Sequence, residues 1–138
     1  MSDSDCVFCK VIAGDLPSHK VYEDDTLVAI LDISPINPGH TLFIPKVHST
    51  NIAEMSPEDV ASLYAAARRV APAILKAAEA ESFNLSTNVG RAAGQVVFHT
   101  HVHLIPRHPA DGYEPWTRND KYHQDLASVA ERIRANLV

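Results

Sequence analysis

The stretch FHTHVHLIPR, residues 98–107, places a histidine at every second position, as His99, His101 and His103. Side chains of a β-strand alternate between its two faces, so this spacing predicts a strand with all three imidazoles on one face. The other face carries four residues, three of them apolar and expected to point into the core: Phe98, Thr100, Val102 and Leu104. Three rings on a rigid strand form a platform on which chemistry can take place.

Three interpretations of this platform are open from the residues themselves. The rings could be surface histidines on a half-exposed strand, although strict alternation argues against this. They could hold a catalytic metal ion through His-x-His with a third ligand from elsewhere, as in zinc hydrolases. Alternatively, one neutral imidazole nitrogen could attack a phosphorus atom while its other nitrogen donates to a carbonyl or an acid.

The composition is typical of one soluble domain with its own core. The 138 residues are 46% hydrophobic and carry a formal net charge of -5, with a mean hydropathy of -0.10. The sequence has no basic stripe, which argues against a nucleic-acid partner. Apolar runs such as TLVAIL, residues 26–31, are too short to cross a bilayer, so we expect no membrane partner. The first ten residues lack the apolar segment of a signal peptide, and two cysteines fit a reducing compartment, so we expect a cytoplasmic protein.

The pattern of apolar residues predicts an antiparallel α+β domain. Short strands are expected at residues 19–23, 26–33 and 40–45. Two longer strands are expected at residues 82–90 and 95–107, joined by a tight hairpin connection with the sequence RAAG at residues 91–94.

Two helices are expected, one after the third strand and one at the C-terminus. Ser56, followed by Pro57 and two acidic residues, is typical of a helix start. An apolar face with three–four spacing continues from there, and Pro72 is expected to kink the helix or to divide it in two. Residues 108–120 are too rich in Pro, Gly and Asp for regular structure, and residues 125–138 predict an amphipathic helix.

The pair Cys6 and Cys9 is ambiguous by itself. A Cys-x-x-Cys can be a redox pair, half of a zinc site or two core cysteines. A thioredoxin-like role requires a strand before the motif, and only five residues precede Cys6. A structural zinc ion requires two further nitrogen or sulfur ligands.

The triad stretch HTHVHLI, residues 99–105, resembles the signature of the histidine triad (HIT) superfamily of nucleotide hydrolases and transferases. Three other segments are similar to successive parts of that family: CVFCKVIAGDLPSHKVYED at residues 6–24, LDISPINPGHTLFIPKVH at residues 31–48 and NVGRAAGQ at residues 88–95. The resemblance implies a single HIT domain over residues 1–138, with its core at residues 6–108 and a C-terminal loop and helix at residues 109–138. It further implies a five-stranded antiparallel sheet with a long helix and a C-terminal helix, and a homodimer.

The resemblance also implies roles for the catalytic residues. His101, the middle histidine, would attack the α-phosphorus of a nucleotide and carry a covalent nucleotidyl group, which water then releases. The backbone carbonyl of His99 would accept from the far nitrogen of that ring, and His103 would donate to the phosphate oxygens. Gln95 is expected to assist at the same place.

A nucleotide pocket follows from the same comparison. Asp32 would bind both ribose hydroxyls, Ile33 would line the slot for the base, and His40 would lie near the phosphate. The residues expected to bind phosphate through side-chain amide or backbone groups are Asn88, Gly94, Gln95 and Val97. Without the resemblance, Asp32 could equally form an Asx turn before Pro35.

Some bacterial members of the family bind zinc through residues that correspond to Cys6, Cys9, His48 and His99. The resemblance therefore implies a structural zinc ion and no organic cofactor. Because His99 also adjoins the nucleophile, the zinc ion is expected to hold the N-terminal segment and to orient His99, not to act as the catalyst.

The expected substrates are purine nucleotide derivatives of the AMP phosphoramidate or AMP ester type. Val96 stands where the phosphoramidase branch has a serine that helps to protonate the leaving group, which weakens the case for a phosphoramidate. Two alternatives are a dinucleoside polyphosphate hydrolase and a nucleotide-binding regulatory module in which hydrolysis is incidental.

Overall fold

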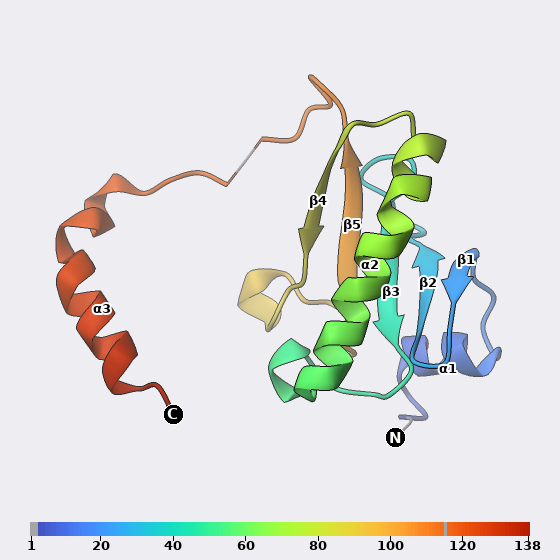
Figure 1. Ribbon diagram of the computed structural model, residues 1–138, viewed down its shortest axis with the longest axis horizontal. Coiled ribbons are helices and arrows are strands. Elements are labelled where there is room, and N and C mark those ends of the chain that lie inside the picture. The colour runs from blue at the N-terminus through green and yellow to red at the C-terminus, as the bar shows by residue number, and fades with distance from the viewer. Residues whose placement is uncertain (1–2, 115) are drawn as a thin grey trace.

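The computed structural model describes residues 3–114 and 116–138, except for the side chains of residues 123 and 124. In chain order the elements are α1 (Val7–Ala13), β1 (Lys20–Glu23), β2 (Leu27–Leu31), β3 (Thr41–Pro45), the 3-10 helix η1 (Ile52–Glu54), α2 (Pro57–Ala77), β4 (Ser82–Ser86), η2 (Arg91–Ala93), β5 (Val102–Arg107), η3 (Asp120–Asp125) and α3 (Leu126–Ala135). The strands form one antiparallel sheet in the order β1-β2-β3-β5-β4 (Figure 1). The predicted fold, a five-stranded antiparallel sheet with a long helix and a C-terminal helix, is confirmed.

Both faces of the central strands are buried. The long helix α2 packs on β3 and β5 (Figure 1), over a core of ten buried residues: Leu27, Ala29, Phe43, Leu63, Ala66, Ala67, Ala71, Ile74, Val102 and Leu104. The alternate residues of β2 and β3 face the other side and form a second cluster with α1: Phe8, Val28, Ile30, Leu42 and Ile44. Side-chain alternation along the strands thus supplies one core beneath α2 and a second beneath α1.

The sequence pattern did not predict the helix α1. It has only seven residues and ends at Gly14, which adopts a left-handed conformation with φ of 84°. An amphipathic repeat of so few residues is too short to be distinguished from a loop. The helix begins at the cysteine motif, because Cys6 is its N-cap.

The start of α2 lies where the sequence predicts it. The Ser56 hydroxyl accepts a hydrogen bond of 3.1 Å from the backbone N–H of Asp59, and Pro57 is the first helical residue. The helix continues through Pro72 and is not divided in two. Pro72 lies on the exposed side of α2, where water can satisfy the carbonyl group that lacks its intrahelical donor.

The connection between β4 and β5 differs from the expected tight turn. The strands span Ser82–Ser86 and Val102–Arg107, so residues 87–101 form a loop that contains η2. Gly90 and Gly94 flank η2 with φ angles of 85° and 90°, which turn the chain away from a strand path. As a consequence His99 and His101 precede β5, and only His103 lies on the strand.

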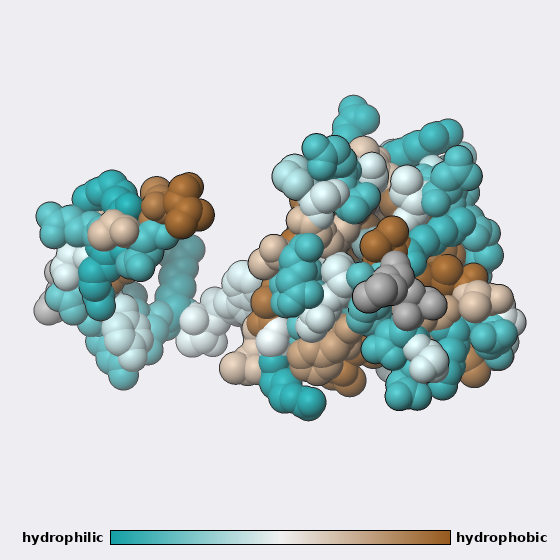
Figure 2. Space-filling model, turned by 90° about the horizontal axis from the view of Figure 1, so that it is seen from below, coloured by the Kyte–Doolittle hydropathy of each residue, from teal (hydrophilic) through white to brown (hydrophobic). Residues whose placement is uncertain are grey.

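The C-terminal part of the chain has the predicted character. Residues 108–114 and 116–119 contain no helix or strand, and α3 follows close to its expected position. Figure 1 shows α3 apart from the sheet, and Figure 2 shows the same segment as a separate lobe joined by a narrow connection. Among the residues described, no helix has the length and apolar character needed to cross a membrane.

Gly39, which precedes β3, offers a test of how tightly the sheet packs against the end of α2. Its φ angle is +89°, and an added Cβ atom would lie 3.2 Å from the Cβ atom of Ala78 and 3.2 Å from Cγ of Pro106. Gly39→Ala is expected to lower the free energy of unfolding in urea by about 3 kcal/mol, from backbone strain and overpacking together. The control is Gly112→Ala, because Gly112 has a φ of +88° and nothing within 4 Å; it should cost only about 1 kcal/mol. Equal losses in the two variants would contradict the packing at Gly39.

Candidate functional site

A cavity of about 630 Å³ opens on the face of the sheet that α1 covers. Its apolar lining comes mainly from α1, the segment after it, β2 and β3: Val7, Phe8, Val11, Leu16, Pro17, Ile30, Leu31 and Leu42. Its polar lining includes Asp32, Asn88, His101 and His103. The volume suits a small organic ligand, and the lining is apolar with a few polar groups, as in most ligand sites.

The ring of His101 is held in one tautomer. Its Nδ1 atom lies 2.7 Å from the backbone oxygen of His99. A carbonyl oxygen can only accept, so Nδ1 carries the proton and Nε2 keeps its lone pair. Burial lowers the pKa of His101, while the bond to His99 and the charge of Asp32 oppose the shift. A neutral imidazole with a free nitrogen in a cavity is a nucleophile.

His40 and His103 form a second ordered pair. The backbone N–H of Ile36 donates to Nδ1 of His40 over 3.1 Å, so the proton of His40 resides on Nε2. That Nε2–H donates to Nδ1 of His103 over 2.9 Å. The ring of His103 therefore carries its own proton on Nε2, which is available as a donor to a ligand in the cavity.

Asp32 makes a turn contact and lines the cavity at the same time. One carboxylate oxygen accepts the backbone N–H of Ser34 over 2.8 Å. The other oxygen lies 3.5 Å from Nε2 of His40. The Asx-turn interpretation and the ligand interpretation are thus compatible, because a carboxylate accepts several hydrogen bonds.

Four side chains behind the cavity could hold a metal ion: Cys6, Cys9, His48 and His99. Their ligand atoms lie within 4.8 Å of one another. Nδ1 of His99 is 3.4 Å from Sγ of Cys6, 3.5 Å from Sγ of Cys9 and 3.1 Å from Nδ1 of His48. Two thiols and two imidazoles are the donor set of a tetrahedral structural zinc site.

The hydrogen bonds around this cluster suit a metal ion. Nε2 of His99 lies 2.7 Å from the backbone oxygen of Pro45, so it carries the proton and leaves the lone pair of Nδ1 facing the thiols. A ligating histidine usually donates its other N–H to an acceptor in this way.

A second group, Asp32, His40 and His103, is equally close together. There, however, Nδ1 of His40 accepts a hydrogen bond from the backbone N–H of Ile36. Ligation through Nε2 of His40 would require a proton on Nδ1, where it would face the N–H of Ile36. The first group therefore suits a metal ion, and the second suits a chain of hydrogen bonds.

Comparison with known proteins agrees with this geometry. The family model described as the HIT domain matches residues 13–110. The protein Hit of Bacillus subtilis is 44% identical over 136 residues, which are 96% of this chain and 94% of that protein. This chain belongs to the HIT family.

Other relatives carry more specific names. The adenylylsulfatase HINT3 of Arabidopsis thaliana is 49% identical over 108 residues, which are 78% of this chain and 55% of that protein, so the match spans about half of its length. A solved HIT family structure from Bacillus subtilis has a TM-score of 0.87 and 42% identity, and covers 98% of this chain and 99% of that one. A zinc-bound histidine triad protein from Mycobacterium smegmatis has a TM-score of 0.76 and 36% identity, and covers 96% of this chain and 98% of that one.

The structure brings most of the predicted nucleotide-binding residues of this HIT domain to one cavity. Its lining includes Asp32, Ile33, Asn88, Gly94, Val97, His101 and His103. His40 is 3% exposed and lies behind His103. Val96, the departure from the phosphoramidase pattern, is 85% exposed at the cavity.

Gln95 is placed differently from the expectation that it acts on the phosphate. Its side chain is buried, and its amide group donates to the backbone oxygens of Thr50 and Val97. Its side-chain oxygen accepts the N–H of Gly90 over 2.8 Å. In this arrangement the side chain of Gln95 holds the loop before the triad and does not line the cavity.

The apolar residues of α1 are the part of the site that the sequence did not indicate. Val7 and Val11 are one helical turn apart, and Phe8 lies between the two cysteines. Once a helix is known to begin at Cys6, this spacing predicts an apolar face. From the sequence alone only the cysteines suggest a role, as metal ligands. Nothing in the sequence indicates that their apolar neighbours line a cavity.

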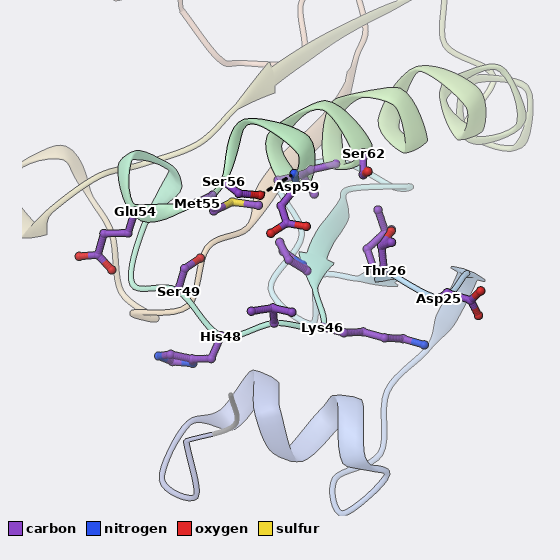
Figure 3. A pocket seen from close by; sticks show the side chains of 14 residues that line it. Asp25, Thr26, Lys46, His48, Ser49, Glu54, Met55, Ser56, Asp59 and Ser62 are labelled. Carbon is purple, nitrogen blue, oxygen red and sulfur yellow. Dashed lines mark hydrogen bonds between the residues drawn. The ribbon is translucent and has the colours of Figure 1, made fainter. Parts of the chain in front are cut away.

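A smaller cavity of about 210 Å³ lies near the start of α2. Figure 3 shows its polar side chains, among them Asp25, Lys46 and Asp59, and shows His48 between the start of α2 and α1. None of the three triad histidines lines it. It shares only His48 with the metal cluster and is separate from the triad cavity.

The environment of His103 predicts an unusual titration. Burial, together with positive charge on His101 or His40, lowers the pKa of His103 to about 4. In an NMR titration of ¹⁵N-histidine-labelled protein, His103 should therefore stay neutral from pH 8 down to pH 5. The same ring in urea-denatured protein should titrate near pH 6.5. A midpoint near pH 6.5 in the folded protein would contradict a buried, neutral donor.

Proposed function

We propose that this HIT protein is a nucleotide hydrolase or nucleotidyl transferase that acts at the α-phosphorus of purine nucleotide derivatives. The observation that carries the proposal is the ring of His101, whose proton is bound by the carbonyl of His99 and whose other nitrogen is free beside the cavity. That arrangement supports a covalent nucleotidyl-His101 intermediate.

The reaction proceeds in two displacements. Nε2 of His101 attacks the α-phosphorus, the P–N bond forms and the bond to the leaving group breaks. The positive charge that develops on the ring is stabilised by the carbonyl of His99. Water then attacks the same phosphorus and loses a proton to solvent, the P–N bond breaks with its electron pair returning to Nε2, and the nucleoside monophosphate is released.

The surrounding groups stabilise the charge on the phosphate oxygens. The Nε2–H of His103 donates to them, and the chain from Ile36 through His40 keeps that proton in place. Backbone groups of Gly94 and Val97 and the amide of Asn88 complete the phosphate subsite. Fixed donors of this kind contribute a few kcal/mol each, because they need no reorganisation in the transition state.

The rest of the cavity accommodates a nucleoside. The carboxylate of Asp32 accepts from the two ribose hydroxyls, and the apolar wall with Ile33 packs against the purine. The substrates are AMP derivatives of the phosphoramidate or ester type. Val96 donates no proton, which favours leaving groups that depart as stable anions; the name of the Arabidopsis relative, an adenylylsulfatase, points in the same direction.

We infer that the metal ion is zinc and that its role is structural. The two thiols, the two imidazoles and the bond from His99 to Pro45 support this assignment, and so does the zinc-bound relative from Mycobacterium smegmatis. The ion supplies a cross-link between the N-terminal segment and the residues around the triad. Free thiols that can ligate a metal suit the cytoplasm, where we place the protein.

The intermediate can be trapped directly. Protein denatured at alkaline pH, where a P–N bond to histidine survives, during turnover of an AMP ester with an acidic leaving group should carry the added mass of an AMP group on the peptide that contains His101. His101→Ala should lose the adduct and reduce kcat/KM by about a thousandfold or more, while it still binds AMP. His19→Ala, which changes an exposed histidine outside the cavity lining, is the control and should keep both adduct and turnover. Full turnover by His101→Ala would contradict the proposal.

A homodimer is part of the same proposal. On α3 and just beyond it, Leu126, Ile133 and Leu137 are 64%, 58% and 71% exposed, and these residues share one face of the helix. The edge strand β4 also exposes Phe83 and Leu85. A monomer rarely leaves so much apolar surface uncovered, and a second copy would cover it.

The oligomeric state tests this part. Light scattering on protein eluted from a size-exclusion column should give about twice the chain mass of 15.1 kDa. Ile133→Asp should shift the dimer towards the monomer by at least about tenfold in dissociation constant, because it places a charge on the apolar face. Ser128→Asp places the same charge on the opposite face of α3 and should leave the dimer intact. A monomeric wild-type protein would contradict the inference.

A further inference from the structure

The short helix α1 belongs to the metal cluster and to the cavity at the same time. Cys6 and Cys9 point to the cluster, while Val7, Phe8 and Val11 line the cavity. Figure 1 shows α1 running across the strands near one end of the sheet. One wall of the cavity is therefore built on the segment that carries two of the four metal ligands.

The position of α1 depends on few interactions. It has seven residues, its N-cap Cys6 makes no side-chain cap hydrogen bond, and only Phe8 and Cys9 are buried. A helix of this length has little stability by itself, so contacts outside the helix must hold it. Such contacts come from Phe8, from Val11 and Ile12, which pack partly buried against the second core cluster, and from the metal cluster.

Phe8 connects the helix to the nucleophile. Its ring packs edge-on against His101, with centroids 5.0 Å apart and planes at 79°. It makes a similar contact with His99 at 6.0 Å. A second support of the His101 ring is the carbonyl of His99, and the side chain of His99 belongs to the metal cluster. The third is the ring of His103, whose centroid lies 4.9 Å away. Two of the three supports of the nucleophile thus lead to the metal cluster.

We propose that metal binding by Cys6, Cys9, His48 and His99 raises the affinity of the cavity for nucleotide, with Phe8 as the positioning residue that connects the two sites. The metal ion fixes α1, and α1 brings its apolar wall and Phe8 against the ligand and the ring of His101. This inference rests on the proposed function, because it takes a nucleotide as the ligand.

Thermodynamic linkage gives the proposal a quantitative form. If the metal ion raises the affinity for a nucleotide by some factor, the nucleotide must raise the affinity for the metal ion by the same factor. A metal ion that stabilises the fold without affecting the cavity would leave the nucleotide affinity unchanged, which is a factor of one. The linkage is measured by binding alone, without reference to turnover.

The experiment uses the full chain, zinc and AMP. AMP affinity is measured by calorimetry on zinc-loaded protein and on protein freed of zinc by a chelator, and circular dichroism establishes that the chelated protein is folded. We expect AMP to bind at least about tenfold more weakly without zinc. Zinc affinity, from competition with a chromophoric chelator, should rise by the same factor in saturating AMP.

A variant in the connecting side chain tests the route and does not depend on metal-free protein. Phe8→Ala keeps all four ligands, so it should bind one zinc ion per chain. We expect it to bind AMP at least about fivefold more weakly and to change the NMR shifts of the His101 ring. Phe8→Leu should recover most of the affinity. Val21→Ala, on an exposed apolar residue of β1 away from the cavity, should leave both unchanged.

The outcomes separate this proposal from the proposed function. Equal AMP affinities, within twofold, for loaded and metal-free folded protein would overturn the linkage while leaving nucleotide binding intact. If the chelated chain unfolds, equal AMP affinities for zinc-loaded wild type and Phe8→Ala would overturn it in the same way. Failure of the zinc-loaded wild type to bind AMP at all would overturn the proposed function, and this inference with it.

Discussion

The hydrogen bond between Nδ1–H of His101 and the carbonyl of His99, 2.7 Å long, is the interaction on which the rest of the site depends. It determines which nitrogen of His101 carries the proton, and therefore which nitrogen can attack. The carbonyl belongs to a residue whose own ring is fixed twice, by the oxygen of Pro45 and by the cysteine cluster. The sheet and α1 serve to hold this one bond in place beside a cavity.

Burial and hydrogen bonding act together on the histidines. Removal from water lowers the pKa of His40, His99, His101 and His103, so all four rings favour the neutral form. A neutral ring has one donor and one acceptor nitrogen, so the position of its proton decides which nitrogen can donate and which can accept. In this site backbone groups set three of the four tautomers, through the N–H of Ile36 and the carbonyls of Pro45 and His99, and the ring of His40 sets that of His103.

The sequence predicted which residues lie together at the site better than it predicted their local structure. Family segments pointed to the triad, to seven residues that line the cavity and to four side chains that lie close enough to hold a metal ion, because these depend on residue type and spacing. Alternation wrongly extended β5 back to residue 95, since it cannot reveal that Gly90 and Gly94 turn the chain out of the sheet. The sequence could not predict α1, because seven residues show too little periodicity. Nor could it predict the contact of Phe8 with His101, because that contact joins segments far apart in the chain. Gln95 matched the family by type, but its buried side chain bonds to Thr50 and to its own loop.

The state of the His101 ring is the most direct test of the central claim. Selective ¹⁵N labelling of histidine distinguishes a protonated ring nitrogen from one with a free lone pair, and comparison with His101→Gln assigns the signals. At pH 7 we predict a protonated Nδ1 and an unprotonated Nε2 in His101, with the Nδ1 proton hydrogen-bonded. A proton on Nε2, or a doubly protonated ring at that pH, would contradict a nucleophile aimed into the cavity.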